Sequence, residues 1–170
     1  GQAVVHHHRG QLNEAHKTLK EAMALAQELG DGVSQAYILS RIGALYGERG
    51  HLGRGEHSLE LALARAKALG KPEIRLYASI HLGLIRVQGG KSEGIAQIEG
   101  AIEEAKERGM GFLMAGGTLI LGQALEAQGH MLRARAAFEG AAALAETYRE
   151  QRVKGQAEEA LTRLEPDTQA

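Results

Sequence analysis

Cysteine and tryptophan are absent from the 170 residues, and proline occurs only twice. Without cysteine the chain has no disulfide framework and no thiolate, which is compatible with a reducing cytoplasm. Aromatic residues make up only 4% of the chain, and no run alternates apolar and polar residues with period two. Because Ala, Leu, Glu and Arg are abundant instead, the composition favours helices over strands.

Neither sign of charge dominates, since the formal net charge is −1 and acids and bases are interspersed. This balance removes the electrostatic argument for nucleic acid or an anionic membrane as the partner. A run of about 18 apolar residues, as a membrane span needs, is missing, and no signal peptide is visible. We therefore expect a cytoplasmic protein. The chain starts at Gly1 in the middle of its pattern, so we expect a fragment of a longer protein.

The segment from Arg41 to Gly70 is the template that the rest of the chain repeats. Its apolar residues recur at steps of three and four, which places them on one stripe of each of two helices. Gly50 lies between the two stripes and can adopt the positive φ that ends a helix. Gly43 and Gly55 lie inside the expected helices, where glycine costs about 0.5 to 1 kcal/mol relative to alanine. We expect both glycines to allow two helix backbones to approach closely.

Three other segments carry the same small and apolar residues in the same order. Inside the upstream helices the marker is Gly43, Gly83 and Gly122, with Ala3 in the first. The turns are expected at Gly10, Gly50, Gly89 or Gly90, and Gly129. Twelve residues beyond the turns come Ala22, Ala62, Ala101 and Ala141. Such a fixed period indicates a stacked repeat.

This pattern resembles the tetratricopeptide repeat (TPR) family, with the best match at Gly43, Tyr46, Gly50, Leu59 and Ala62. The resemblance covers nearly the whole chain. The usual repeat is near 34 residues, whereas this one is about 40, as in bacterial signalling and transcription-regulator proteins. The chain departs from the family at Arg86 and Leu125, where tyrosine is common. The resemblance implies an all-α fold, a right-handed α-solenoid of antiparallel helix pairs, which is the TPR superhelix.

We expect one domain over residues 1–170, since 44% hydrophobic residues suffice for a core. Its parts are a truncated first repeat (1–30), repeats 32–70, 72–109 and 111–149, and a C-terminal capping helix at about 152–164. The capping helix is either separate from the preceding one, which Gly155 favours, or a continuation of it. The expected helices are Gln2 to Arg9, Leu12 to Leu29, Gly32 to Arg49, Leu52 to Leu69, Pro72 to Gln88, Ser92 to Arg108, Phe112 to Gln128, Leu132 to Arg149 and Arg152 to Leu164.

In this family the first helix of each pair lines a concave groove, and the resemblance implies that the groove binds a peptide or protein. The residues that it places there are Tyr37, Ser40, Ala44, Glu48, Tyr77, Ile80, Leu84, Val87, Gln88, Leu119, Gln123 and Glu126. The stripe of Ile80, Leu84 and Val87 is covered either by a neighbouring helix or by a ligand. The lysines, arginine and asparagines with which some members hold a chaperone's C-terminal carboxylate are replaced at Ser40, Ala44, Ile80, Leu84, Leu119 and Gln123, so that partner is disfavoured.

No residue pattern indicates catalysis, a cofactor or a metal. His6, His7 and His8 would spread around a helix, about 100° apart, and neither HExxH nor a His-x3-His pair occurs. His81 lies in an apolar helix and reads as a partly buried histidine. GHLGRG at Gly50 to Gly55 follows a helix and lacks the GK[ST] ending of a phosphate loop. The serines have no evident base, so we expect no enzyme.

Three functions remain open. The first is a protein-interaction scaffold that binds a peptide or protein segment, in a larger bacterial regulatory protein. The second is a ligand-sensing or autoinhibitory domain of a transcription activator or signalling ATPase or kinase. The third is a self-association element that forms a homodimer through the truncated N-terminal repeat, where Val4 and Val5 are apolar.

Overall fold

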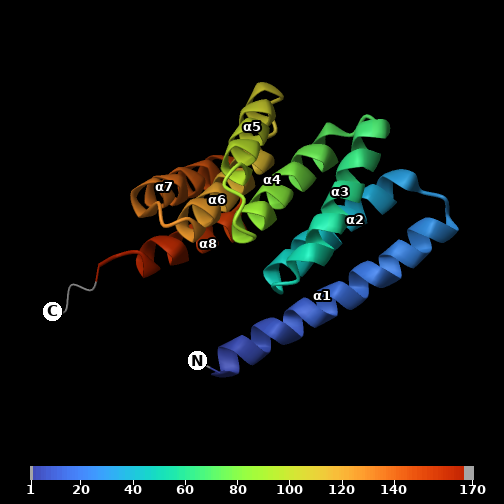
Figure 1. Ribbon diagram of the computed structural model, residues 1–170, viewed down its shortest axis with the longest axis horizontal. Coiled ribbons are helices and arrows are strands. Elements are labelled where there is room, and N and C mark those ends of the chain that lie inside the picture. Colours follow the sequence, from blue (N-terminus) through green and yellow to red (C-terminus); the bar gives the residue numbers. More distant parts are fainter. Residues whose placement is uncertain (1, 167–170) are drawn as a thin grey trace. The chain divides into compact units, whose positions relative to one another are not determined.

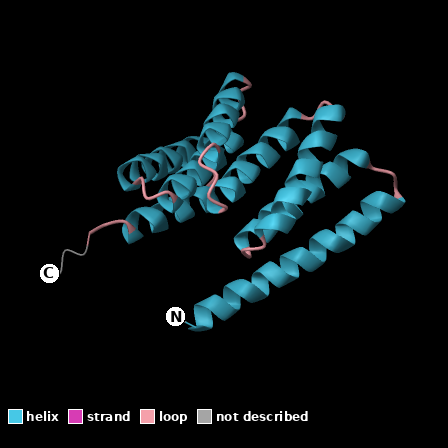
Figure 2. Ribbon diagram, in the orientation of Figure 1, coloured by secondary structure: helices cyan, strands magenta, loops and turns pink. Residues whose placement is uncertain are grey.

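The computed structural model describes the backbone of residues 2–166 and the side chains of residues 9–166. Within these residues the chain forms eight helices and no strand (Figure 1, Figure 2). The helices are α1 (Gln2–Glu28), α2 (Gly32–Glu48), α3 (Leu52–Ala68), α4 (Pro72–Gln88), α5 (Gly94–Glu107), α6 (Gly111–Ala127), α7 (Met131–Tyr148) and α8 (Gln151–Arg163). Their sequential packing is that of a helical solenoid, which confirms the predicted all-α class. The right-handed winding stays a prediction.

The chain divides into two compact units, residues 1–78 and residues 79–170, with the boundary inside α4. The first unit holds α1, α2, α3 and the beginning of α4, and the second holds the remainder of α4 and α5 to α8. The single domain over residues 1–170 and its repeat boundaries stay a prediction. From α2 onward, each helix begins and ends within two residues of the predicted bounds.

Glycines with positive φ end six helices at intervals of 19 or 20 residues, as the repeat pattern predicts. At each of them the residue after the glycine donates its N–H to the carbonyl oxygen five residues back, for example from His51 to Tyr46 at 2.9 Å and from His130 to Leu125 at 2.9 Å. This bond satisfies a carbonyl that the helix itself leaves unpaired, as in the Schellman motif. The six glycines are Gly30, Gly50, Gly70, Gly90, Gly109 and Gly129.

The turn predicted at Gly10 is wrong, because α1 continues through this residue as one helix (Figure 1). A cap at Gly10 would end the helix and require the preceding segment to pack back on the following one. That segment carries three consecutive histidines and Arg9 at its end, so it has little apolar surface to repay the lost helix. Continuing the helix keeps every backbone hydrogen bond and costs only about 0.5 to 1 kcal/mol for the glycine.

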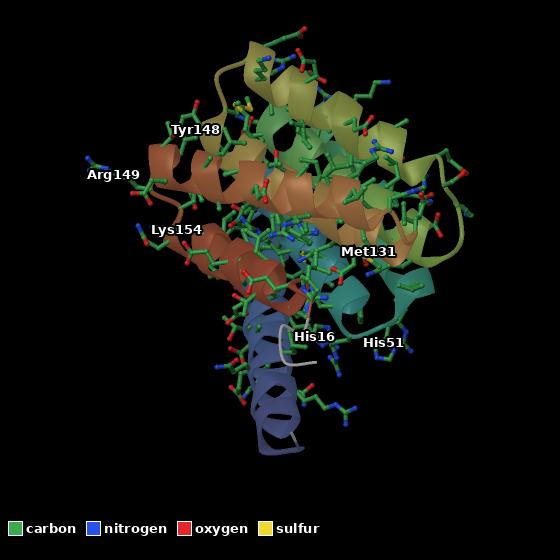
Figure 3. All side chains as sticks on the ribbon, turned by 90° about the vertical axis from the view of Figure 1, so that its left-hand side faces the viewer. His16, His51, Met131, Tyr148, Arg149 and Lys154 are labelled. Carbon is green, nitrogen blue, oxygen red and sulfur yellow. The ribbon has the colours of Figure 1, made fainter. Side chains whose placement is uncertain are left out.

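The helix boundary between α7 and α8 lies at Arg149, within two residues of the predicted bounds, so the last helix is separate from α7 and not its continuation. Gly155, which was taken to favour the break, lies inside α8 and does not form it. Arg149 adopts the left-handed conformation with φ 58°, 20 residues after Gly129, so it occupies the position that glycine holds at the other helix ends. The N–H of Glu150 completes the cap on the carbonyl oxygen of Ala145 at 2.8 Å. Figure 3 shows Arg149 beside Tyr148 where the chain leaves α7.

Replacing Arg149 by glycine is expected to raise the free energy of unfolding by about 0.5 to 1 kcal/mol, because the left-handed region strains every L residue that carries a Cβ. Chemical denaturation followed by helical circular dichroism measures the change. The control is Arg152→Gly inside α8, which should destabilise by a similar amount because glycine weakens a helix interior. A loss of stability in Arg149→Gly would contradict this account of the cap.

The glycines inside α2, α4 and α6 mark close approaches to the following helix, as the sequence predicts for Gly43. A Cβ added at Gly43 would lie 2.5 Å from Cγ of Leu59 and 3.1 Å from the carbonyl oxygen of Gly55. At Gly83 it would lie 2.6 Å from Cγ1 of Ile98, and at Gly122 it would lie 2.6 Å from Cε1 of Phe138. These separations are too short for any real Cβ. Each pair α2–α3, α4–α5 and α6–α7 is therefore closed by one glycine against one large apolar side chain.

Candidate functional site

The structure separates the twelve predicted groove residues by their exposure. Five have buried side chains: Ser40, Ala44, Ile80, Val87 and Leu119. Four are half-buried: Tyr77, Leu84, Gln123 and Glu126. Three are exposed: Tyr37, Glu48 and Gln88. A partner that leaves the helices in place can touch the last two groups. Whether any of the twelve residues contacts a partner stays a prediction.

Ile80 and Val87 are covered by packing inside the second unit, which is one of the two alternatives that their apolar stripe left open. Ile80 Cδ1 lies 3.1 Å from where a Cβ of Gly117 on α6 would be. Val87 Cγ2 lies 2.8 Å from where a Cβ of Gly94 on α5 would be. Two glycines on neighbouring helices thus make room for these side chains. In α4, Leu84 is the member of the stripe that keeps accessible surface.

A cluster of Tyr37, Arg41 and Tyr77 forms the most distinctive part of the accessible surface of the first unit. The guanidinium carbon of Arg41 lies 5.0 Å from the ring centroid of Tyr37 and 4.3 Å from that of Tyr77. Arg41 Nη1 also donates to the hydroxyl oxygen of Tyr77 at 3.3 Å. Both ring contacts fall within the range of a cation–π interaction. We call these three residues the Tyr-Arg-Tyr cluster.

The Tyr-Arg-Tyr cluster holds its geometry through its helices. Tyr37 and Arg41 are four residues apart on α2, so their side chains lie on the same face one turn apart. Ser40 is 1% exposed, and its hydroxyl donates to the carbonyl oxygen of Tyr37 at 2.6 Å. Tyr37 itself is 46% exposed. The cluster therefore presents one open ring on a rigid helical base.

Arg41 was missed in the sequence analysis, although both tyrosines were chosen. The available signal was the spacing of four between Tyr37 and Arg41 together with the 40-residue repeat that makes Tyr77 the equivalent of Tyr37 on the next even-numbered helix. The spacing alone could not reveal that the arginine side chain contacts both rings. That placement depends on the distance between α2 and α4.

Glu126 is engaged by the last helix of the second unit. Arg163 on α8 donates from Nη2 to Glu126 Oε2 at 3.0 Å, and its Nη1 bonds the other carboxylate oxygen. The two parallel bonds fix the guanidinium in the plane of the carboxylate. α8 therefore covers the carboxylate of a residue that the sequence predicted to face a partner.

His16 on α1 contacts the end of α2 in the first unit. Its ring meets Tyr46 edge to face, with centroids 5.1 Å apart, and Arg49 Nη1 lies 3.3 Å from His16 Nδ1. Because an arginine can only donate, Nδ1 accepts and the proton of the neutral ring belongs on Nε2. His51, labelled with His16 in Figure 3, faces Tyr46 at a centroid distance of 6.2 Å. The three rings join α1, α2 and the turn before α3.

Burial lowers the pKa of His16 below the ordinary value of 6.5, and the positive charges of Lys20, Arg49 and Arg54 lower it further. A histidine whose pKa is lower in the folded than in the unfolded state stabilises the fold above pH 6.5, and this stabilisation is lost as the pH falls through the folded-state value. Acid therefore weakens the docking of α1.

The midpoint of thermal unfolding is expected to fall more in the parent protein than in His16→Gln when the pH is lowered from about 7 to about 5. Glutamine cannot titrate, so the variant lacks this part of the pH dependence. Lys20→Gln is the companion variant, because removing one of the cations should bring the pKa of His16 closer to its ordinary value. The midpoint of thermal unfolding should then change less steeply with pH, so the slope is reduced. Identical slopes in the parent and in His16→Gln would refute this assignment.

Residues 9–166 contain no group of three or more histidine, aspartate or glutamate side chains arranged to hold a metal ion. His6, His7, His8, Val4 and Val5 lie outside the described side chains. In the part of the chain that the structure describes, no helix is both long enough and apolar enough to cross a membrane.

The helices, their sequential packing and their repeated glycine contacts define a helical repeat protein. The family model described as "Anaphase-promoting complex subunit 5" matches residues 1–49, which cover α1 and α2, and this family is a TPR-like helical repeat family. No curated protein matches the chain.

Proposed function

We propose that the chain is a protein-interaction scaffold that binds a peptide or a protein segment, with the accessible face of α2 in the first unit as one contact surface. The observation that carries the proposal is the match of residues 1–49 to a family whose description names a subunit of a complex. The exposed Tyr37 and the half-buried Arg41 on this face support it, since Tyr and Arg are enriched among the residues that dominate binding energy at protein interfaces.

We further propose that the scaffold has no catalytic activity of its own and needs no cofactor. The sequence supports this because it has no cysteine and no serine with an evident base. The resemblance to long TPR repeats supports a regulatory, cytoplasmic and bacterial setting for the parent protein. The role of scaffold does not depend on that setting.

Capture of partners from the native source, with the chain as bait and mass spectrometry as the readout, tests the scaffold role. Tyr37→Ala is expected to reduce the recovery of a specific partner by about tenfold or more, as for a residue at an interface centre. Leu61→Ala on α3 is the matched control, because Leu61 is a large apolar residue that is 37% exposed, close to the 46% of Tyr37. Equal recovery with both variants would refute the choice of face, and the absence of any specific partner would refute the scaffold role.

A further inference from the structure

We infer that Arg41, held in the Tyr-Arg-Tyr cluster, binds the carboxylate of an aspartate or glutamate side chain in an acidic segment of a partner protein. This inference rests on the scaffold role proposed above and specifies the chemistry of one contact in it. It concerns only the first unit, since Tyr37, Arg41 and Tyr77 all belong to residues 1–78.

The charge of Arg41 has no counterion among the described side chains. Within residues 9–166 no carboxylate pairs with Arg41, and its polar contact there is the hydroxyl of Tyr77. Four arginines of the second unit differ from it, because each pairs with a glutamate: Arg108 with Glu104, Arg133 with Glu99, Arg135 with Glu139 and Arg163 with Glu126. A half-buried cation without a counterion costs free energy, which a bound carboxylate would offset.

The two tyrosine rings decide how an anion can reach Arg41. The guanidinium carbon lies 5.0 Å from the ring centroid of Tyr37 and 4.3 Å from that of Tyr77, so both rings restrict the approach of an anion. The Nε atom is buried and has no hydrogen-bond partner. A guanidinium has five N–H bonds. With Nε–H covered and one Nη1–H directed at Tyr77, the donors left for a ligand are on the two terminal nitrogens and lie in the guanidinium plane.

A carboxylate fits this arrangement. It accepts two parallel hydrogen bonds in the plane of a guanidinium, and the fixed fork of arginine makes that bidentate pairing specific. Arg41 is half-buried, so such a pair is less exposed to water than one on an open surface, which strengthens the attraction. Tyr37, with 46% of its surface exposed, provides an open aromatic surface for the carbon chain that bears the carboxylate.

The source of the carboxylate is a side chain and not the end of a polypeptide. A C-terminal aspartate or glutamate has one carboxylate on its main chain and one on its side chain. Binding both of them needs several cations or amides that converge on that residue. The positions that supply them in chaperone-binding members of the TPR family correspond here to Ser40, Ala44, Ile80, Leu84, Leu119 and Gln123, of which none carries a charge and only Gln123 carries an amide. A single arginine between two tyrosines can hold one carboxylate. An acidic segment offers several of these and can shift along the site to present one.

The test is a titration of the isotope-labelled protein with a short oligoglutamate peptide, acetylated and amidated at its ends, followed by nuclear magnetic resonance. The Nε–H of Arg41 is the reporter, because it is buried and its chemical shift responds to an anion on the guanidinium. Oligoglutamine with blocked ends is the neutral control. Oligoglutamine with a free C-terminal carboxylate distinguishes a chain end from a side chain.

Oligoglutamate is expected to shift the resonances of Arg41 and Tyr37 and to bind about tenfold more weakly to Arg41→Gln. Its affinity for the parent protein should fall when salt is added. Arg65→Gln removes the same charge from α3 of the same unit, where Arg65 Nη1 donates to Gln35, and should leave binding within about twofold. Arg41→Lys keeps the charge and the stem but not the fork, so it should also bind more weakly. It provides the comparison if Arg41→Gln does not fold.

Equal affinity for the parent and Arg41→Gln, an equal effect of Arg65→Gln, or no binding of oligoglutamate overturns the inference. The inference is also overturned if oligoglutamine with a free C-terminal carboxylate binds more tightly than blocked oligoglutamate. The scaffold role is judged separately. If Tyr37→Ala abolishes capture of a native partner while Arg41→Gln leaves it unchanged, the scaffold role stands and the carboxylate contact falls.

Discussion

Replacing Phe138 by alanine is expected to lower the free energy of unfolding by about 3 to 5 kcal/mol. Phe138 has no exposed surface, and its ring lies against Gly122 at the crossing of α6 and α7. The apolar neighbours on the same face of α7 are Ala134 and Ala141, which are too small to fill the space that the ring would leave. A cavity in a rigid helix pair collapses poorly, so the cost should lie toward the upper part of the range for a phenylalanine.

Chemical denaturation followed by circular dichroism measures this loss. Phe112→Ala is the matched control, because Phe112 is 51% exposed and its removal should change stability by no more than about 0.5 kcal/mol. A double-mutant cycle with Gly122→Ala identifies the cause. If the ring fills the space over Gly122, Phe138→Leu should recover part of the cost of Gly122→Ala. Additive effects, or equal losses for Phe138 and Phe112, would contradict this packing.

Replacing Gly94 by alanine is expected to destabilise the protein by about 1 to 3 kcal/mol, as overpacking does. An added Cβ would overlap the carbonyl oxygen of Gly83 and lie 2.8 Å from Cγ2 of Val87. A backbone oxygen cannot rotate away as a side chain can, so α4 and α5 would have to separate. For a protein of this size the midpoint of thermal unfolding should fall by about 2 to 4 °C for each kcal/mol.

Gly100→Ala is the control in the same helix. A Cβ at Gly100 would have nothing within 4 Å, so alanine should stabilise α5 by about 0.5 to 1 kcal/mol through its better helix propensity. The same substitution is therefore expected to act with opposite signs at two positions of α5. Stabilisation by Gly94→Ala would show that α4 and α5 do not approach each other as closely as this structure indicates.

The helix pairs could be predicted from the sequence because glycine and alanine serve a recurrent packing need. Gly43, Gly83 and Gly122 recur because a large apolar side chain of the following helix excludes a Cβ at each crossing. Such a need leaves the same residue at the same register, and the period can be read without coordinates. The helix boundaries from α2 onward follow from the same glycines.

The errors lie where local chemistry departs from the repeat. Gly10 has the right register, but the segment before it has too little apolar surface to support a turn, so the helix continues. Arg149 has the conformation of a turn glycine without being one. A register of small residues predicts a turn at the first site wrongly. At the second it predicts the end of the helix, but not that an arginine adopts the left-handed conformation there.

The candidate site was predictable only in part. Tyr37 and Tyr77 could be found from their equivalence in the repeat. The burial of Ile80 and Leu119 could not, because an apolar residue on an inner helix has the same sequence signature whether a ligand or a neighbouring helix covers it. Ile80 is buried because Gly117 is small enough to admit its side chain, and this contact joins positions far apart in the chain. Arg41 was overlooked because its contact with Tyr77 also joins positions far apart in the chain.

Site-specific photo-crosslinking tests most directly whether the accessible face of α2 is a contact surface for a partner. A photoreactive amino acid is placed at Tyr37 on α2 or at Leu61 on α3, and the protein is irradiated with its captured partner. The account predicts a covalent adduct with the partner from position 37 and none from position 61. Crosslinking from position 61 alone would contradict it, because the partner would then bind α3 and not this face of α2.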